Sequence, residues 1–193
     1  MANVFALYSV GSSIAKFLTD TYPQTEAGQM PICKFDLVSS SDLAGDIEEA
    51  TRITLYIYRV TANEHARQIR PDHTANAKTA SLGLDLHFLL SAWGGSAREE
   101  LVTLAWAMRQ LHLHPILDAS SLTPEAEWAG DQIEIIPAEL STEDIVRIWD
   151  ALEPAYRLSV PYIARVVRLD PDTEEEDRPV LALHSGFGTE APR

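Results

Sequence analysis

Hydrophobic and polar positions alternate along five segments of the chain, a pattern that predicts β-strands. The segment 52–60 is the clearest, because it is rich in β-branched and aromatic residues. In the segment 32–38, Cys33, Phe35 and Leu37 share one face while polar residues share the other, as in a half-buried strand. The five predicted strands are 32–38, 52–60, 81–91, 132–136 and 157–169.

Three other segments repeat apolar residues at steps of three and four, which is typical of amphipathic helices. Pro23, Pro115 and Pro154 follow these segments and mark their ends, because a residue before proline avoids the helical region. Ser141 and Asp144 form a variant capping box at the start of the third segment. The three predicted helices are 2–19, 97–112 and 141–152.

The order of these elements predicts an α+β fold, with one mixed, mostly antiparallel sheet of about four to five strands packed with two to three helices. A chain of 193 residues suits one domain. We expect that domain to span residues 1–170, and residues 171–193 to form an acidic, flexible tail, since blocks of like charge are usually solvated.

The net charge of −14 argues against a nucleic-acid partner and against an anionic membrane surface. No apolar run reaches the ~20 residues that span a bilayer. No basic region followed by an apolar core begins the chain, so we expect no secretory signal. The single cysteine, Cys33, lies in an apolar alternation and fits a buried thiol in a reducing compartment.

Motifs that carry chemistry are missing from the sequence, which contains no phosphate-binding glycine loop, no nucleophile elbow and no His-Glu-x-x-His pair. His112 and His114 lie two residues apart, so a helix would point them in different directions. His87 alternates with Asp85 on what we expect to be a solvated strand face. We therefore predict no catalytic, cofactor-binding or metal-binding residue, and no enzyme.

The segment 157–169 carries three arginines in or beside one strand, namely Arg157, Arg165 and Arg168. A cation on a strand face often marks a protected sheet edge. Pro161 supports that interpretation, because proline lacks the N–H that a central ladder needs. The hypothesis is an edge strand at 157–169, or alternatively at 132–136, that accepts a partner's strand; a surface strand without a partner is the alternative.

Residues 61–80 carry almost no large apolar side chain and form a long connection, of a kind that is usually functional or mobile. Arg67 and Arg70 lie in it and are further candidates for partner contact; plain disorder is the alternative. The acidic tail is either solvated or docks on a basic partner.

An ordered set of segments resembles a known family: the N-terminal-domain family of the tail terminator, or cap, protein of phage-tail-like contractile injection systems of the antifeeding-prophage and Photorhabdus-virulence-cassette type. The resemblance covers roughly residues 2–170. It rests on the segments 53–60, 82–92, 105–112, 115–117, 140–152, 156–160 and 165–170.

This resemblance implies a structural protein that forms a homohexameric ring, with the sheath and inner-tube proteins as partners and no cofactor. Such a ring closes the baseplate-distal end of the inner tube and sheath and ends their polymerisation. It also implies synthesis in the cytoplasm and incorporation into the particle. A monomeric peptide-binding adaptor or regulatory module of the same system is the alternative from another class.

Overall fold

A six-stranded sheet organises the computed structural model, which describes residues 2–23, 30–45, 50–63, 81–128 and 130–170. The strand order is β1-β2-β3-β6-β5-β4, and all neighbours are antiparallel except β1 and β2, which are parallel. The strands are β1 (Lys34–Val38), β2 (Arg52–Ala62), β3 (Leu82–Trp93), β4 (Ile116–Asp118), β5 (Gln132–Pro137) and β6 (Ser159–Leu169).

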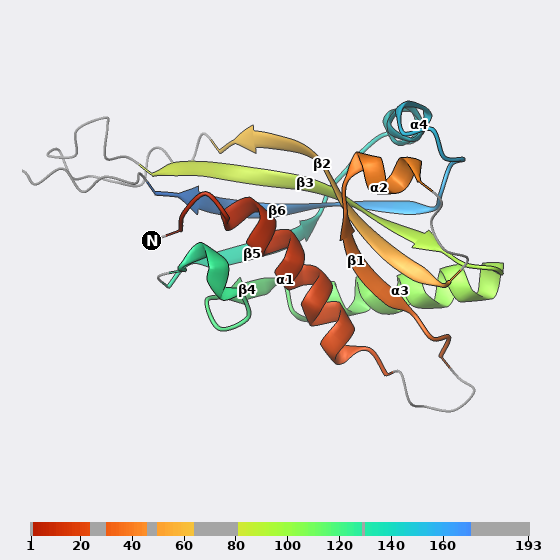
Figure 1. Ribbon diagram of the computed structural model, residues 1–193, viewed down its shortest axis with the longest axis horizontal. Coiled ribbons are helices and arrows are strands. Elements are labelled where there is room, and N and C mark those ends of the chain that lie inside the picture. The colour runs from red at the N-terminus through yellow and green to blue at the C-terminus, as the bar shows by residue number, and fades with distance from the viewer. Residues whose placement is uncertain (1, 24–29, 46–49, 64–80, 129, 171–193) are drawn as a thin grey trace, which may run out of the picture.

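Two long helices cover one face of the sheet (Figure 1). These are α1 (Ala6–Thr21) and α3 (Ala97–Leu113), and they enclose the main core with strand residues such as Phe88 and Leu90. On α1, Val10, Ile14 and Leu18 recur every four residues and are buried, as the apolar periodicity predicts.

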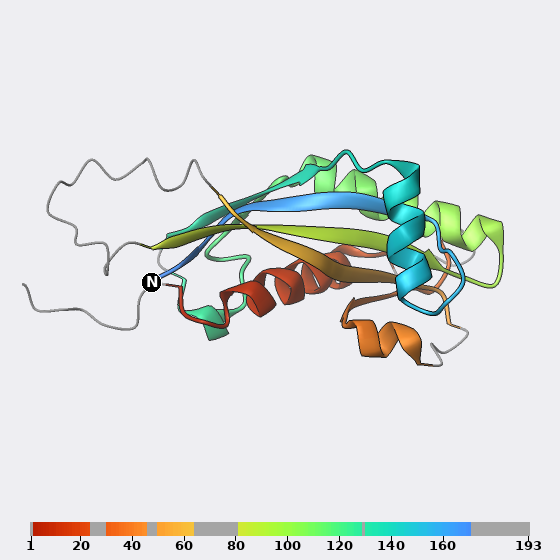
Figure 2. The same ribbon diagram turned by 90° about the horizontal axis from the view of Figure 1, so that it is seen from above.

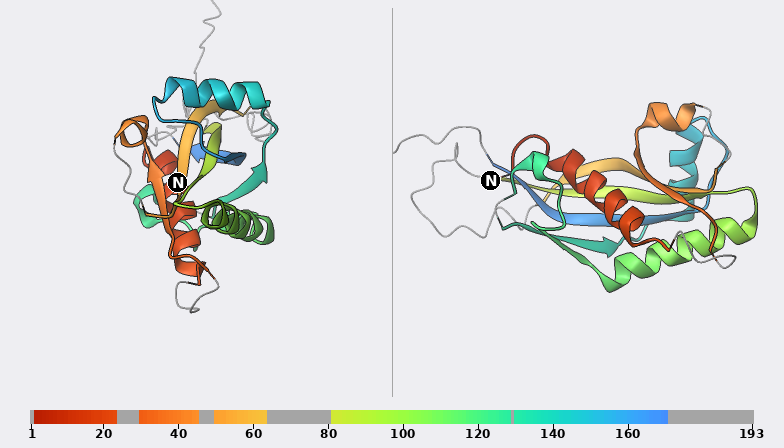
Figure 3. Two further views of the ribbon diagram at one scale, coloured as in Figure 1. Left: turned by 90° about the vertical axis from the view of Figure 1, so that its right-hand side faces the viewer. Right: turned by 60° about the horizontal axis from the view of Figure 1, so that its bottom comes forward.

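The opposite face carries a smaller layer at one end only (Figure 2). There α4 (Thr142–Ala151) and the short α2 (Ser40–Ala44) enclose a second cluster of Leu43, Trp93, Trp149 and Leu152. Seen along the strands, α4 lies on one side of the sheet and α1 and α3 on the other (Figure 3). The rest of this face has no helix over it within the described residues.

The α+β class and the mixed, mostly antiparallel sheet are confirmed. All five predicted strands and all three predicted helices are present, and the Ser141 side chain caps α4 by accepting the Asp144 N–H. The sequence patterns did not indicate the three-residue β4 or α2. Ser39 is the N-cap of α2, and its side chain forms a reciprocal capping box with Asp42. The sequence analysis expected only a polar turn at this position.

Candidate functional site

The two edges of the sheet are β1 and β4. Both edge hypotheses drawn from the sequence are therefore wrong, because β6 lies between β3 and β5, and β5 lies between β6 and β4. Pro161 is tolerated in an inner strand because of its position. Its carbonyl accepts the N–H of Ala138, so its missing N–H faces the β5 side at the level where β5 has ended.

Within the described residues, half of β2 has no strand beside it on the β1 side. Lys34–Val38 pairs with β2 residues 52–56, whereas β2 continues to Ala62. The N–H of Asn63 donates to the carbonyl of Gly83 on β3. Along a strand of an antiparallel pair, the backbone groups of successive residues point alternately toward the partner strand and away from it. The N–H and C=O groups of Val60 and Ala62 therefore point away from β3. We call residues 57–62 on this side the open β2 edge.

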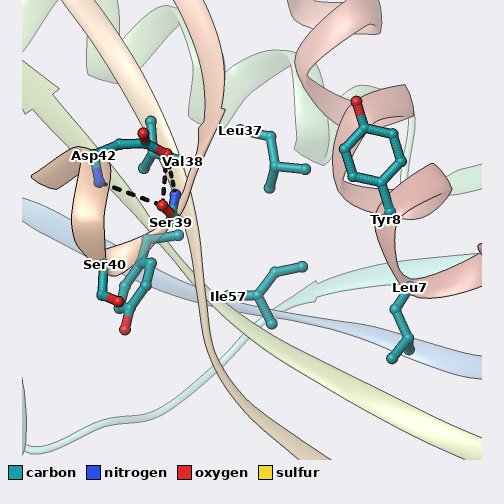
Figure 4. A pocket seen from close by; sticks show the side chains of 9 residues that line it. Leu7, Tyr8, Leu37, Val38, Ser39, Ser40, Asp42 and Ile57 are labelled. Carbon is teal, nitrogen blue, oxygen red and sulfur yellow. Dashed lines mark hydrogen bonds between the residues drawn. The ribbon is translucent and has the colours of Figure 1, made fainter.

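A groove begins where β1 leaves the sheet and the chain turns into α2. Its volume is about 490 Å³. Figure 4 shows the side chains of Tyr8, Leu37 and Ile57, from α1, β1 and β2, arranged around an open space, while Ser39 and Asp42 bond to each other on its rim. The groove is thus lined by apolar groups and lies directly beside the open β2 edge.

Close packing of α1 against β1 shapes this groove. A Cβ added to Gly11 would stand 2.8 Å from Leu37 Cδ1, so a side chain here would force Leu37 to move, and glycine lets the helix approach β1 closely. At the start of α1, Val4, Phe5 and Tyr8 are more than half exposed. An apolar surface therefore continues from the groove onto the outer side of the helix.

The arginine candidates occupy different environments. Arg165 and Arg168 are exposed on β6 and make no salt bridge within the residues that the structure describes. Arg157 instead lies over the Trp93 ring, with Cζ 4.6 Å from the ring centroid, and 3.8 Å from Glu100. Arg67 and Arg70, like the acidic tail 171–193, lie outside the described residues, so their roles stay predictions.

A bulge in β6 changes which of its residues face the core. Val166 adopts φ +61°, in the left-handed region that β-branched residues rarely occupy, and its N–H bonds to the Asp85 carboxylate. The register shifts there, so Val167 joins Ala164 in the core while Arg165 is exposed. In a strand without a bulge, in which successive side chains alternate between the two faces, Arg165 and Val167 would share one face.

His87 lies on the uncovered part of the sheet face, opposite Arg59 in the β2–β3 register and hydrogen-bonded to Thr61. Burial lowers the pKa of this imidazole, and the Arg59 guanidinium lowers it further. The ring of Tyr58 lies 6.1 Å away, and burial raises the pKa of its phenol. The group forms a polar and aromatic surface in which His87 is mostly neutral at pH 7.

Cys33 is buried, and burial raises the pKa of its thiol to about 12. The thiolate form that reacts is therefore scarce at neutral pH. Within the described ranges, no three side chains of His, Cys, Asp or Glu are grouped to hold a metal ion. The helices of the same ranges include none that is long and apolar enough to cross a membrane.

Sequence reasoning missed the open β2 edge and the groove. The difference in length between the predicted strands 32–38 and 52–60 gave no sign that one covers only half of the other, because pairing partners are not written in a strand's own pattern. Val4 stands at helical spacing from the buried stripe of α1 and yet is exposed, because spacing alone does not show where a stripe ends.

The family model of the Pvc16 N-terminal domain matches residues 9–182. The chain belongs to the Pvc16 N-terminal domain family. Comparison with curated proteins found no match.

Two solved structures share the fold of this Pvc16 N-terminal domain. The sheath/tube terminator of PVC, an extracellular contractile injection system, in its extended state has a TM-score of 0.61 at 15% identity, over 96% of this chain and 64% of that one. The tube-terminating cap of the anti-feeding prophage has a TM-score of 0.58 at 14% identity, over 92% of this chain and 60% of that one. The chain thus spans just under two thirds of these relatives.

Proposed function

We propose that this chain is a cap of a contractile injection particle, which closes the baseplate-distal end of the inner tube and sheath and so ends their growth. The observation that carries the proposal is the fold match: nearly the whole chain aligns with two terminators of such particles, and its family is the Pvc16 N-terminal domain. A homohexameric ring, made in the cytoplasm and built into the particle, is part of the proposal.

The surface is suited to that role. A growing tube presents an open-ended, heterologous interface, and a cap has to bind it while offering nothing complementary on the far side. The net charge of −14 gives the chain a strongly acidic surface, which disfavours the binding of other acidic proteins where no complementary contacts are present. Arg157, Arg165, Arg168, Arg67 and Arg70 remain our candidates for contacts with sheath or tube, with Arg165 and Arg168 the most accessible of those that the structure describes.

Electron microscopy of particles from cells that lack this chain tests the proposal. We expect tubes of uneven and greater length with incompletely ordered sheaths, and restoration of uniform length when the chain is supplied from a plasmid. A length distribution that is unchanged in the deletion strain would show that growth ends without this protein and would overturn the proposal.

A further inference from the structure

We propose that copies of this chain join head to tail through their sheets, with the open β2 edge of one copy receiving β4 of the next. This inference deepens the proposed function and rests on it for its biological role, since a cap over a round tube needs copies that close into a ring. The evidence lies in the level, the direction and the chemistry of the two edges.

The two edges stand at the same height across the sheet. In the register, Val60 pairs with Leu86, Leu86 with Ala164, and Ala164 with Ile135. Glu134, the neighbour of Ile135, pairs with Ile116 of β4. A second copy displaced sideways, without a shift along the strands, therefore brings its β4 to the level of the open β2 edge.

The two edges also run in the same direction. Each step from β2 to β3, β6, β5 and β4 is antiparallel, and four reversals leave β4 pointing as β2 does. Adjacent strands of a twisted sheet turn by about 20–25° per step, so a neighbour that pairs here has to be rotated as well as displaced, and its β4 would then lie parallel to β2. That is the orientation of β1, and the incoming strand would continue the line of β1 beyond Val38.

The chemistry of the edges is complementary. The open β2 edge offers the N–H and C=O groups of Val60 and Ala62. The outer side of β4 offers both groups of Ile116 and the N–H of Asp118, whose carbonyl already accepts the N–H groups of Ser121 and Leu122. Exposed apolar side chains border both edges, Val60 at 44% on one and Leu113 and Ile116 at 61% and 54% on the other. Val60 and Ile116 face opposite sides of the sheet, so the match between the edges is one of backbone groups. Because the two edges differ, each copy keeps one of each free, and the contact repeats until a ring closes.

Disulfide trapping with purified full-length protein tests this joint. The pairings place Val60 on the same sheet face as Ile135, through Leu86 and Ala164. Thr61 is the chain neighbour of Val60, and Glu134, which pairs with Ile116, is the neighbour of Ile135, so Thr61 and Ile116 both point to the other face. We therefore place cysteines at these two positions (Thr61→Cys with Ile116→Cys). The native Cys33 is buried with its thiol pKa raised to about 12, which keeps the background low. Under oxidation, the double variant should give a ladder of dimers, trimers and larger species.

Controls make the outcome decisive. Each single-cysteine variant should give no cross-linked species on a denaturing, non-reducing gel. The pair Val60→Cys with Ile116→Cys should give at least tenfold less cross-linked product, because Val60 faces the opposite side of the sheet. Dimers from Thr61→Cys alone would show two-fold pairing of identical edges and overturn the proposal. The proposal would also be overturned if the double variant gave no specific ladder at protein concentrations at which the single variants begin to cross-link.

Ala62→Pro provides a second measurement in the double-cysteine background. Proline removes an N–H that points away from β3, so the fold and melting temperature should be kept, as on other free edges, while the ladder falls at least tenfold. Ala62→Val, which keeps the N–H, should leave the ladder unchanged. An undiminished ladder from the proline variant would overturn the backbone pairing. Particle length in the deletion strain reports on the cap function alone, so the two proposals fail separately.

Discussion

One face of the sheet has two ends that differ completely. At the covered end, under α4, the indole N–H of Trp149 donates to Ser159 and that of Trp93 donates to Thr54, at 3.1 and 2.9 Å. At the open end, Arg59 and His87 stand in a surface with no helix over it within the described residues. The same strands β2 and β3 carry both ends.

The difference shows that burial on this face depends on the helices α4 and α2 that cover it, and not on the strands. The small hydroxyl residues Thr54, Ser91 and Ser159 leave room for two indole rings and bond to them or to each other. Both indole N–H groups therefore have a hydroxyl acceptor, and buried polar groups are tolerated when they are hydrogen-bonded. The open end has larger, charged side chains that suit contact with water or another chain.

Trp149→Ala should have the largest effect, because it removes the side chain that anchors α4 on the covered end. We expect a loss of about 3–5 kcal/mol of unfolding free energy, measured by urea denaturation. Val146→Ala on the outer side of the same helix is the matched control and should change little. Equal losses from both variants would show that Trp149 is not the side chain that anchors α4, because alanine favours the helix at both positions.

Ser159→Ala should have the next largest effect. The hydroxyl accepts from Trp149 and bonds with Ser91 at 2.8 Å, and its loss leaves a buried indole N–H without an acceptor. We expect a loss of about 1–3 kcal/mol by the same measurement. Ser120→Ala, which removes an exposed hydroxyl bonded to Asp118, should be nearly neutral. A neutral Ser159→Ala would mean that water replaces the lost oxygen.

Asp85→Ala tests the bulge at the open end. The carboxylate accepts from the Val166 N–H and from the Asn63 amide, so its removal should speed hydrogen exchange at Val166 and cost about 1–2 kcal/mol. Val166→Gly in that background should recover part of the loss, because glycine adopts the left-handed region without strain. Glu134→Ala is the exposed control. Unchanged exchange at Val166 would show that the bulge needs no anchor.

Arg59→Gln should have the smallest effect, a change in the pKa of His87 alone. Burial and then Arg59 hold the pKa of His87 below its ordinary value of 6.5. A histidine whose folded pKa is depressed loses stability as pH falls from 6.5 through the folded pKa, since the unfolded chain binds the proton first. Removing Arg59 should raise the pKa in an NMR titration, but not to 6.5, because burial remains. Arg109→Gln on α3 should leave that titration unchanged, and an unmoved pKa in Arg59→Gln would contradict the assignment.

The sequence was sufficient for the elements with strong periodicity. The stripe on α1 and the β-branched run in β2 specify a helix and a strand locally, and Ser141 marks the start of α4 by its own side chain. It was not sufficient for the order of the strands, because edge and inner strands of one sheet share the same alternation. Pro161 misled for that reason: its missing N–H faces a place where the next strand has already ended.

The candidate surface was predicted only in part. Exposure of Arg165 and Arg168 agrees with their being candidates, although the contact itself stays a prediction. Arg157 has the same residue type and is packed on Trp93, a contact that depends on the fold and not on spacing. The open β2 edge arises because β1 turns into α2 at Ser39, and no local pattern in β2 records where its neighbour stops.

Two hydrogen bonds join Ala2 and Asp170. The N–H of Ala2 donates to a carboxylate oxygen of Asp170, and the N–H of Asp170 donates to the carbonyl of Ala2. A pull on the chain at residue 170 is thus shared at once between β6 and the segment that leads into α1. Strands loaded along their length resist in shear, with many ladder bonds strained together. The end of β6 is therefore tied to a second segment of the domain, so a force that arrives at residue 170 has to break the bonds to Ala2 as well as those of the strand.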